Sequence, residues 1–244
     1  MRGGLIIVAL GLAACDGARE AAPCVKQLFE GESFTVCAFD ARVQDIRLAW
    51  RDADAKAYRS FAALARDLPA GDVAFAMNGG MYDDAGAPIG LYVEYGDQRH
   101  SISTTDGPGN FHLKPNGVFW VDTAGDPHVS ATEAYLAEKP EPVWATQSGP
   151  MLVIDGAMHP AFSEDGESRF VRNGVGVTGE HEARFVISDR PVSFGKMARF
   201  FRDGLKSANA LYLDGTVSSL WAPSLQRMDG GFPLGPMIVV TSPD

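Results

Sequence analysis

A carboxylate stands at the end of an apolar run in the segment "NALYLDGTVSSLW". Asp214 precedes Gly215, and hydroxyl groups follow at Thr216, Ser218 and Ser219. A carboxylate in this place can act as a nucleophile, a base or a ligand, and a flexible glycine lets backbone N–H groups face a bound anion. An ordinary Asp-Gly turn is the simpler interpretation. We take Asp214 as a candidate catalytic residue and Gly215, Thr216 and Ser218 as candidate substrate-binding residues.

Two arginines offer the opposite charge in the segment "SRFVRNGVGV". Arg169 and Arg172 are three positions apart and lead into an apolar strand interrupted by glycine. A guanidinium group can grip a phosphate or carboxylate with its planar fork. Arg172 is therefore a candidate catalytic cation and Arg169 a candidate substrate-binding residue, with a surface salt bridge as the alternative for Arg169.

Two more strand ends combine polar residues with glycine. The run "VAFAM" stops at Asn78, Gly79 and Gly80, and the run "MLVI" is preceded by Gln147, Ser148 and Gly149. Glycine is used where the backbone takes a positive φ or comes close to another group, which includes a ligand. We take Asn78 as a candidate catalytic residue and the other five as candidate substrate-binding residues, with plain turn chemistry as the alternative.

The elements that must position these groups are mostly strands. Ten segments show the period-two alternation of a half-buried strand: 33–39, 46–50, 73–77, 91–95, 117–121, 151–154, 175–178, 184–187, 210–213 and 237–241. Two segments favour amphipathic helices, "SFAALARDL" and "SFGKMARFFRDGL", and each opens with a serine that can cap the first turn. The predicted fold class is α+β, a mixed, strand-rich sheet packed with a few amphipathic helices.

These two helices have matching surroundings. The order "IRLAW", "SFAALARDL", "VAFAM", "NGG" parallels the order "RFVIS", "SFGKMARFFRDGL", "ALYL", "DGT", which indicates two related strand-helix-strand units. If the units pack about a pseudo-twofold axis in one sheet, Asn78 and Asp214 lie at equivalent strand ends and converge on one cleft. Chance repetition, common in α+β proteins, is the alternative.

The N-terminal residues resemble an export signal. Arg2 precedes an apolar run that is far shorter than the roughly 20 residues of a membrane span, and "LAAC" resembles the lipobox of bacterial lipoproteins. We expect a signal peptide at 1–14, a tether at 15–23 and one folded domain at 24–244. Cys15 would then carry a lipid that anchors the protein to a membrane in the cell envelope, outside the cytoplasm. Ordinary cleavage beside an incidental cysteine is the alternative.

Two further cysteines, Cys24 and Cys37, remain in the folded domain. In an oxidising compartment, such a pair favours a disulfide over a metal site. Two free buried thiols are the alternative.

Composition and missing motifs exclude several functions. The net charge of −10 argues against nucleic acid as a partner, because binding to phosphate backbones rests on Lys and Arg. The sequence has no HExxH, GxSxG or Walker motif and no GxGxxG that opens a helix, so it predicts no metal site and no cofactor. A divalent cation at Asp214, or at Asp83 and Asp84, has no motif to support it.

Five segments, taken together, resemble the phosphodiester glycosidase family and its branch of secreted bacterial proteins. They occur in the family's order between Cys24 and Thr241: "AMNGGMY", "GNFHLKPNGVF", "ATQSGPMLVIDG", "RNGVGV" and "NALYLDGTVSSL". The animal member of this family removes N-acetylglucosamine from a phosphodiester and so uncovers mannose 6-phosphate. The family's Asn-Gly-Gly turn falls on Asn78, its arginine on Arg172 and its Asp-Gly-x-x-Ser loop on Asp214.

The resemblance implies a hydrolase of the cell envelope that cleaves the glycosidic bond of a sugar 1-phosphodiester. In this interpretation Asp214 stabilises the sugar cation or activates the attacking group, Arg172 stabilises the departing phosphate, and Asn78 orients a hydroxyl or water. The sequence departs from the family at Thr216, where the animal branch has a run of glycines, and at Ser207 and Ala208, where related bacterial sequences often have a cysteine. A noncatalytic envelope lipoprotein that binds phosphorylated glycans, and a phosphodiesterase that cuts the bond from phosphorus to oxygen, are the alternatives.

Overall fold

The computed structural model describes residues 22–68 and 71–242. The expected signal peptide, most of the expected tether and Cys15 lie outside the described residues. Within the described ranges, no helix is long and apolar enough to cross a membrane.

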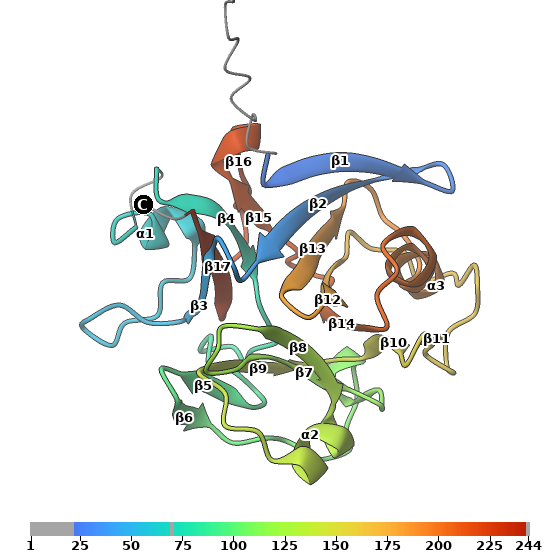
Figure 1. The fold of residues 1–244 in the computed structure, drawn as a ribbon, viewed down its shortest axis with the longest axis horizontal. Helices are drawn as coiled ribbons and strands as arrows, with labels where there is room; N and C mark the ends of the chain where they lie inside the picture. The colour runs from blue at the N-terminus through green and yellow to red at the C-terminus, as the bar shows by residue number, and fades with distance from the viewer. Residues whose placement is uncertain (1–21, 69–70, 243–244) are drawn as a thin grey trace, which may run out of the picture.

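The strands form three sheets in which every paired strand is antiparallel to its neighbour (Figure 1). The first sheet has the order β1 (Cys24–Phe29), β2 (Glu32–Asp40), β13 (Glu182–Ser188), β12 (Asn173–Gly179), β14 (Asn209–Asp214), β10 (Met151–Ile154), β11 (Ala157–Met158). The second sheet has the order β16 (Arg227–Met228), β15 (Leu220–Ala222), β4 (Val73–Asn78), β17 (Met237–Thr241), β3 (Asp45–Ala49). The third sheet has the order β6 (Asp97–His100), β5 (Tyr92–Glu94), β9 (Trp144–Ser148), β7 (Gly117–Val121), β8 (Pro127–Ala131). The α+β class is confirmed, with the strands divided among three sheets.

The inner faces of the three sheets share one hydrophobic core. Phe185 of β13 lies 5.3 Å from Phe75 of β4 and 5.5 Å from Phe119 of β7, measured between ring centroids. One phenylalanine from each sheet therefore meets at the centre, and all three are at most 1% exposed. Burying such large aromatic side chains is the main contribution that ties the sheets into one domain.

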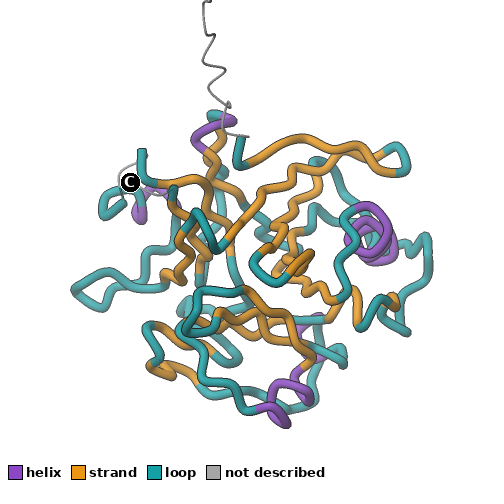
Figure 2. The backbone as a smooth tube through the Cα atoms, in the orientation of Figure 1, coloured by secondary structure: helices purple, strands orange, loops and turns teal. Residues whose placement is uncertain are grey.

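Each sheet also carries one helix on its outer face, as the purple segments at the periphery of Figure 2 show. Helix α1 (Phe61–Leu64) packs on Trp221 of the second sheet, and α2 (Thr132–Glu138) packs on Trp120 of the third. Helix α3 (Phe194–Arg199) continues as a π-helical turn, η2 (Phe200–Gly204), over the first sheet. Ser60 and Ser193 cap α1 and α3 as expected, each accepting a backbone N–H at 3.1 Å. Two 3₁₀ turns, η1 (Asn110–His112) and η3 (Pro223–Leu225), complete the regular structure of the described residues.

The two expected strand-helix-strand units have the same topology but lie in different sheets. Strands β3 and β4 flank β17 in the second sheet, and strands β13 and β14 flank β12 in the first. In each unit the helix connects two parallel strands that enclose an antiparallel one. The expectation of a single sheet is therefore wrong in this detail, because three sheets close around one core.

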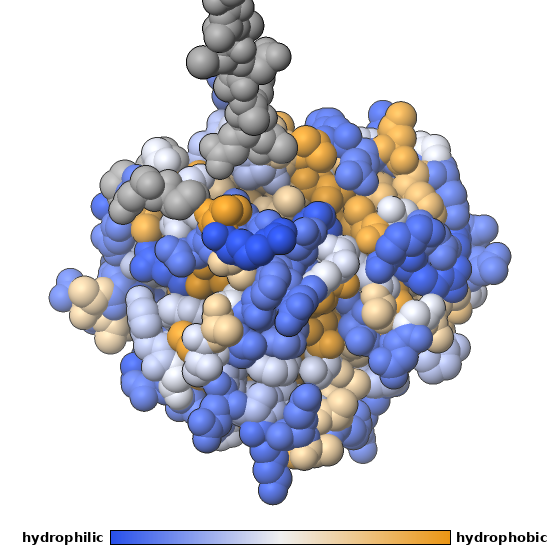
Figure 3. All heavy atoms as spheres, viewed as in Figure 1, coloured by the Kyte–Doolittle hydropathy of each residue, from blue (hydrophilic) through white to orange (hydrophobic). Residues whose placement is uncertain are grey.

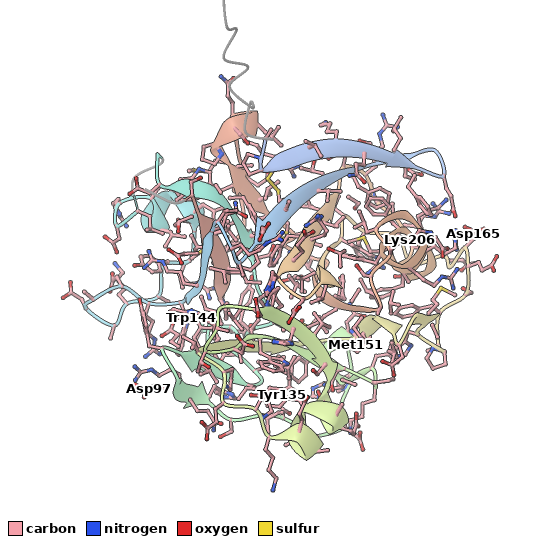
Figure 4. The ribbon with its side chains drawn as sticks, viewed as in Figure 1. Asp97, Tyr135, Trp144, Met151, Asp165 and Lys206 are labelled. Carbon is pink, nitrogen blue, oxygen red and sulfur yellow. A yellow bond between two sulfur atoms is a disulfide. The ribbon has the colours of Figure 1, made fainter. Side chains whose placement is uncertain are left out.

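A disulfide joins Cys24 and Cys37, which are directly opposite each other in the β1–β2 hairpin (Figure 4). Both residues lie in the central core. The surface in Figure 3 is mainly hydrophilic, with smaller apolar areas between polar side chains.

Candidate active site

Three buried polar residues meet where strands of the first and second sheets end. Asn78 closes β4, Asn173 opens β12 and Asp214 closes β14, and Asn173 is paired with Asp214 in the sheet register. Their exposed fractions are 0%, 0% and 8%. Each precedes a glycine, so the same polar-Gly pattern occurs at three converging strand ends.

Hydrogen bonds fix the orientation of the Asn78 amide. Its Oδ1 accepts the Nδ2 of Asn173 at 2.9 Å and the backbone N–H of Ser219 at 2.8 Å. Its Nδ2 is buried and has no hydrogen-bond partner among the described residues. The Asn78 amide favours the charged form of Asp214 and so acts against the rise in the pKa of that carboxyl.

The Asp214 carboxylate is held by the loop that follows it. Its Oδ1 accepts the backbone N–H groups of Gly215 at 2.5 Å, Thr216 at 2.9 Å and Val217 at 3.4 Å. Burial raises the pKa of Asp214, while the three N–H groups and the Asn78 amide act in the opposite direction. A fixed carboxylate with a raised pKa is suited to proton transfer or to stabilising a developing cation.

Asp214 lines a cleft of about 370 Å³, which is within the range of small-molecule sites. The cleft lies between the loop after β4, the loop that carries η1 and the loop after β14. The other lining residues are Met81, Tyr82, Ile89, Pro108, Gly109, Asn110, Phe111, His112, Thr216 and Val217.

Arg172 lies behind the wall of this cleft. Its side chain is fully buried, and its Nε donates to the Val192 carbonyl at 2.9 Å while its guanidinium stacks 3.6 Å above the Phe194 ring. Nη1 donates to the Tyr212 hydroxyl at 3.2 Å and Nη2 to the Ser168 carbonyl at 3.0 Å. Burial lowers the pKa of Arg172. Its partners in the described chain are neutral, so its positive charge is not cancelled by a carboxylate at hydrogen-bond distance.

Tyr212 and Gly215 connect this arginine to the loop that holds Asp214. A Cβ atom added to Gly215 would lie only 1.7 Å from the Tyr212 hydroxyl oxygen and 3.6 Å from Nη1 of Arg172. Only glycine therefore fits at this position while the hydroxyl keeps its place. Burial is the main reason that the pKa of Tyr212 is raised, so the hydroxyl stays protonated.

A comparison with protein families assigns the chain to one of them. The family model described as phosphodiester glycosidase matches residues 71–241, which include all three converging strand ends. The chain belongs to the phosphodiester glycosidase family.

The chain is also similar to one curated protein and, in its fold, to solved structures. The chain is 36% identical over 193 residues to the uncharacterized protein YigE of Escherichia coli (strain K12), covering 78% of this chain and 75% of YigE. Its fold is similar to the catalytic domain of zebrafish N-acetylglucosamine-1-phosphodiester alpha-N-acetylglucosaminidase, auto-inhibited by its pro-peptide, with a TM-score of 0.61 and 13% identity over 91% of this chain and 81% of that one. A hypothetical protein from Synechocystis gives a TM-score of 0.57 and 16% identity over 90% of this chain and 61% of that one.

The Asn-Gly-Gly turn of this family member serves close packing. A Cβ atom on Gly79 would lie 2.6 Å from Cγ1 of Ile238, and one on Gly80 would lie 2.6 Å from Oγ1 of Thr146. Thr146 also donates its hydroxyl to the Gly79 carbonyl at 2.8 Å. The two glycines thus let β4 approach β17 and β9, and neither lines the cleft.

Gln147, Ser148 and Gly149 likewise build the frame of the site. The Gln147 side chain makes four hydrogen bonds, to both backbone groups of Ser103, to the Leu91 N–H and to the Thr132 hydroxyl. Ser148 donates its hydroxyl to the Leu213 carbonyl at 3.0 Å, one residue before Asp214. A Cβ on Gly149 would lie 2.6 Å from the Cβ of Asn116. The third sheet is therefore joined to the strand that carries the carboxylate.

The remaining expected residues lie around the Asp214 loop. Thr216 is exposed and lines the cleft. Ser218 donates its hydroxyl to the Asp214 carbonyl at 2.7 Å and so closes the loop, while Arg169 is exposed and lies outside the cleft lining. Among the expected substrate-binding residues, Thr216 is the one that lines the cleft.

Sequence reasoning missed Asn173, Tyr82 and His112 as site residues. The Asn-Gly pair at 173 and 174 repeats the pattern at Asn78 and Asp214, and this signal was available. No pattern in the sequence indicates that the loops carrying Tyr82 and His112 fold over the same carboxylate.

The described residues contain no group of three or more His, Cys, Asp or Glu side chains that could hold a metal ion. Asp83 is exposed, and its Oδ1 accepts the Ala87 N–H at 2.9 Å within a turn. The Asp83 side chain therefore closes an exposed turn, in which the Gly86 N–H also donates to the Asp83 carbonyl at 2.8 Å.

Proposed function

We propose that this protein hydrolyses the glycosidic bond of a sugar 1-phosphodiester. The observation that carries the proposal is the buried Asp214 carboxylate, fixed by three N–H groups in a cleft of small-molecule size. Family membership supports it, and the zebrafish enzyme with a similar fold is named for this reaction on N-acetylglucosamine.

The proposed reaction breaks the bond between sugar C1 and the phosphate oxygen. The bonding electron pair leaves with the phosphate, and the sugar ring acquires oxocarbenium character that Asp214 stabilises. Water forms the new bond to C1 and gives up one proton to Asp214, which yields a free sugar and a phosphomonoester. A raised pKa makes this carboxylate a stronger base and so favours its role as proton acceptor.

The neighbouring residues have supporting roles in this proposal. Asn78 is fully buried and does not line the cleft, so its proposed role is to support the charged form of the Asp214 carboxylate. Arg172 holds the Tyr212 hydroxyl and places positive charge behind the Gly215 loop, where it opposes the charge of the departing phosphate.

The reaction is tested by incubating the purified full chain in detergent with a panel of sugar 1-phosphodiesters, one of which is an N-acetylglucosamine 1-phosphodiester. We expect free sugar from the wild type and a loss of about 10³-fold or more in Asp214→Asn, in line with removal of an essential charged group. Asp203→Asn is the matched control, because Asp203 pairs with Arg202 on the surface and lies outside the cleft lining.

Running the reaction in ¹⁸O-labelled water identifies the bond that breaks. Label in the sugar supports glycosidic cleavage, whereas label in the phosphate shows a phosphodiesterase and overturns the proposal. Binding of phosphorylated glycans without any turnover would instead support a noncatalytic binding protein.

The proposed place of action is the cell envelope, with a lipid on Cys15. The Cys24–Cys37 disulfide supports an oxidising compartment. Labelling cells with radioactive palmitate tests the anchor: we expect label in the wild type and none in Cys15→Ser, and equal labelling of the two would contradict it.

A further inference from the structure

The cleft lining shows a shortage of positive charge for a phosphodiester substrate. No lysine or arginine is among the described residues that line it, and Asp214 contributes a negative charge. Arg172 is fully buried and bonded to Val192, Tyr212 and Ser168. Of the lining residues, His112 is the one whose side chain can become cationic.

The His112 ring is held in a defined orientation. Its Nδ1 lies 3.0 Å from the Thr105 carbonyl oxygen, which can only accept, so Nδ1 carries a proton. The ring also packs edge-on against Phe111 with 5.1 Å between centroids. Nε2 is thereby left as the ring nitrogen that can carry the additional proton of an imidazolium.

Gly107 makes room for this ring. A Cβ atom there would lie 2.8 Å from Cδ2 and 2.9 Å from Nε2 of His112. Any larger residue at 107 would therefore crowd the edge of the ring that bears Nε2.

The other charged or titratable groups near His112 come from three loops. Asp106, in the same loop as His112, is engaged by Nζ of Lys114 at 2.6 Å. Asp214 and Tyr82 line the cleft from the loops after β14 and β4. Because Asp106 is paired with Lys114, its negative charge is offset at the η1 side of the cleft. An anionic ligand at that side therefore contacts the His112 imidazole without an unpaired carboxylate beside it.

We infer that His112, in its protonated form, binds the phosphate group of the substrate through Nε2–H. This inference rests on the proposed function, and it gives the cleft two ends. The sugar C1 lies at Asp214, and the phosphate lies at the η1 loop. It also assigns direct phosphate contact to His112 and leaves Arg172 as a supporting charge behind the wall.

The test measures binding of the methyl phosphodiester of N-acetylglucosamine 1-phosphate, whose single negative charge is constant over the pH range used. The full chain is titrated at pH 5.5 and pH 8.5 as wild type, His112→Gln, His128→Gln and Asp214→Asn. We expect wild-type affinity to fall by about 10- to 100-fold at the higher pH, the usual effect of losing a charge-assisted hydrogen bond. His112→Gln should bind weakly at both pH values.

Two of these variants are controls. His128 stacks on Trp120 and bonds to Asp122 away from the cleft lining, so His128→Gln should behave as wild type. Asp214→Asn should keep the pH dependence, since protonation of Asp214 would otherwise give a similar trend. If the pH dependence disappears in Asp214→Asn and persists in His112→Gln, the inference is overturned.

An imidazole ¹⁵N spectrum of the wild type guards against misfolding of His112→Gln. Addition of the diester should shift the Nε2 signal of His112 and leave that of His128 in place. Turnover by the wild type with an unshifted His112 signal overturns this inference alone. Absence of both binding and turnover by the wild type overturns it together with the proposed function.

Discussion

The Nδ2 of Asn173 donates to both the backbone carbonyl and the side-chain Oδ1 of Asn78, at 2.9 Å each. Both residues are fully buried, and the contact joins β12 of the first sheet to β4 of the second. The Oδ1 of Asn78 accepts hydrogen bonds from Asn173 and Ser219, which fixes the orientation of the amide. Its Nδ2 then has no hydrogen-bond partner among the described residues. One side chain therefore connects two sheets and orients a group of the candidate active site.

Replacing Asn173 should affect both stability and activity. Asn173→Ala removes one donor from each of two buried Asn78 oxygens, the backbone carbonyl and Oδ1, so we expect the free energy of unfolding to fall by about 1–3 kcal/mol. Turnover should fall by more than the folded fraction does, because the Asn78 amide is free to turn. Urea denaturation and kcat measured on the same preparation check this, and an unchanged kcat per folded molecule would show that the contact is purely structural.

Most of the sheet framework could be predicted from the sequence. All ten expected strands are present, and Ser60 and Ser193 cap the two expected helices. Two of the strands that were missed lack period-two alternation: β6 is exposed along its whole length, and β9 is buried along its whole length. Helix α2 was missed because Ala131, at its N-terminus, offers no side-chain cap.

The candidate site could be predicted only where it depends on local pattern. Asn78 and Asp214 converge as the matching strand-helix-strand units indicate, although they come from different sheets. The surroundings of Arg172 depend on Tyr212 and Phe194, which come from other elements, so its burial could not be predicted from the residues beside it. The need for glycine at position 79 likewise comes from close packing against Ile238 on the neighbouring strand, which the residues beside Gly79 do not indicate.

Asp214 should make folding less favourable as pH rises. Burial raises its pKa above the ordinary value of 3.8, so its contribution to stability is complete below pH 3.8 and is lost as pH rises through the folded-state pKa. Asp214→Asn removes this loss and should raise the melting temperature at pH 7, by roughly 2–4 °C if the effect is near 1 kcal/mol. The gain should shrink as pH is lowered toward 4, and thermal melts across pH 4–8 would reveal a constant or opposite difference if this account is wrong.

Glu30 should show the opposite dependence on pH. Hydrogen bonds from Arg199 and Lys196 lower its pKa from 4.5 to about 2, so its contribution is present above pH 4.5 and is lost as pH falls through about 2. Because the Glu30 side chain is 38% exposed, solvent screens the pair, and Glu30→Gln should cost only about 0.5–1 kcal/mol at pH 7. Melting curves of the two proteins should differ at pH 7 and converge near pH 2. A difference that persists there would indicate a packing effect of the substitution.

Gly215 should tolerate no side chain, because the Tyr212 hydroxyl occupies the space beside its Cα. A Cβ atom would lie 1.7 Å from that oxygen, which Arg172 holds in place. Gly215→Ala must therefore displace either the tyrosine or the loop whose N–H groups hold Asp214. We expect kcat to fall by about 10²-fold, similar to other losses of geometry at a catalytic centre, and stability to fall by about 1–3 kcal/mol.

A double-mutant cycle with Tyr212→Phe separates this clash from a general effect of alanine. Removing the hydroxyl relieves the closest contact, although the ring carbon that carried it would still lie 3.0 Å from the new Cβ. The double variant should thus recover part of the stability lost in Gly215→Ala. Gly230→Ala is the matched control, since a Cβ there meets no atom within 4 Å. If Gly215→Ala behaves like Gly230→Ala in kcat and in unfolding, then neither the Tyr212 hydroxyl nor Arg172 behind it constrains the carboxylate loop.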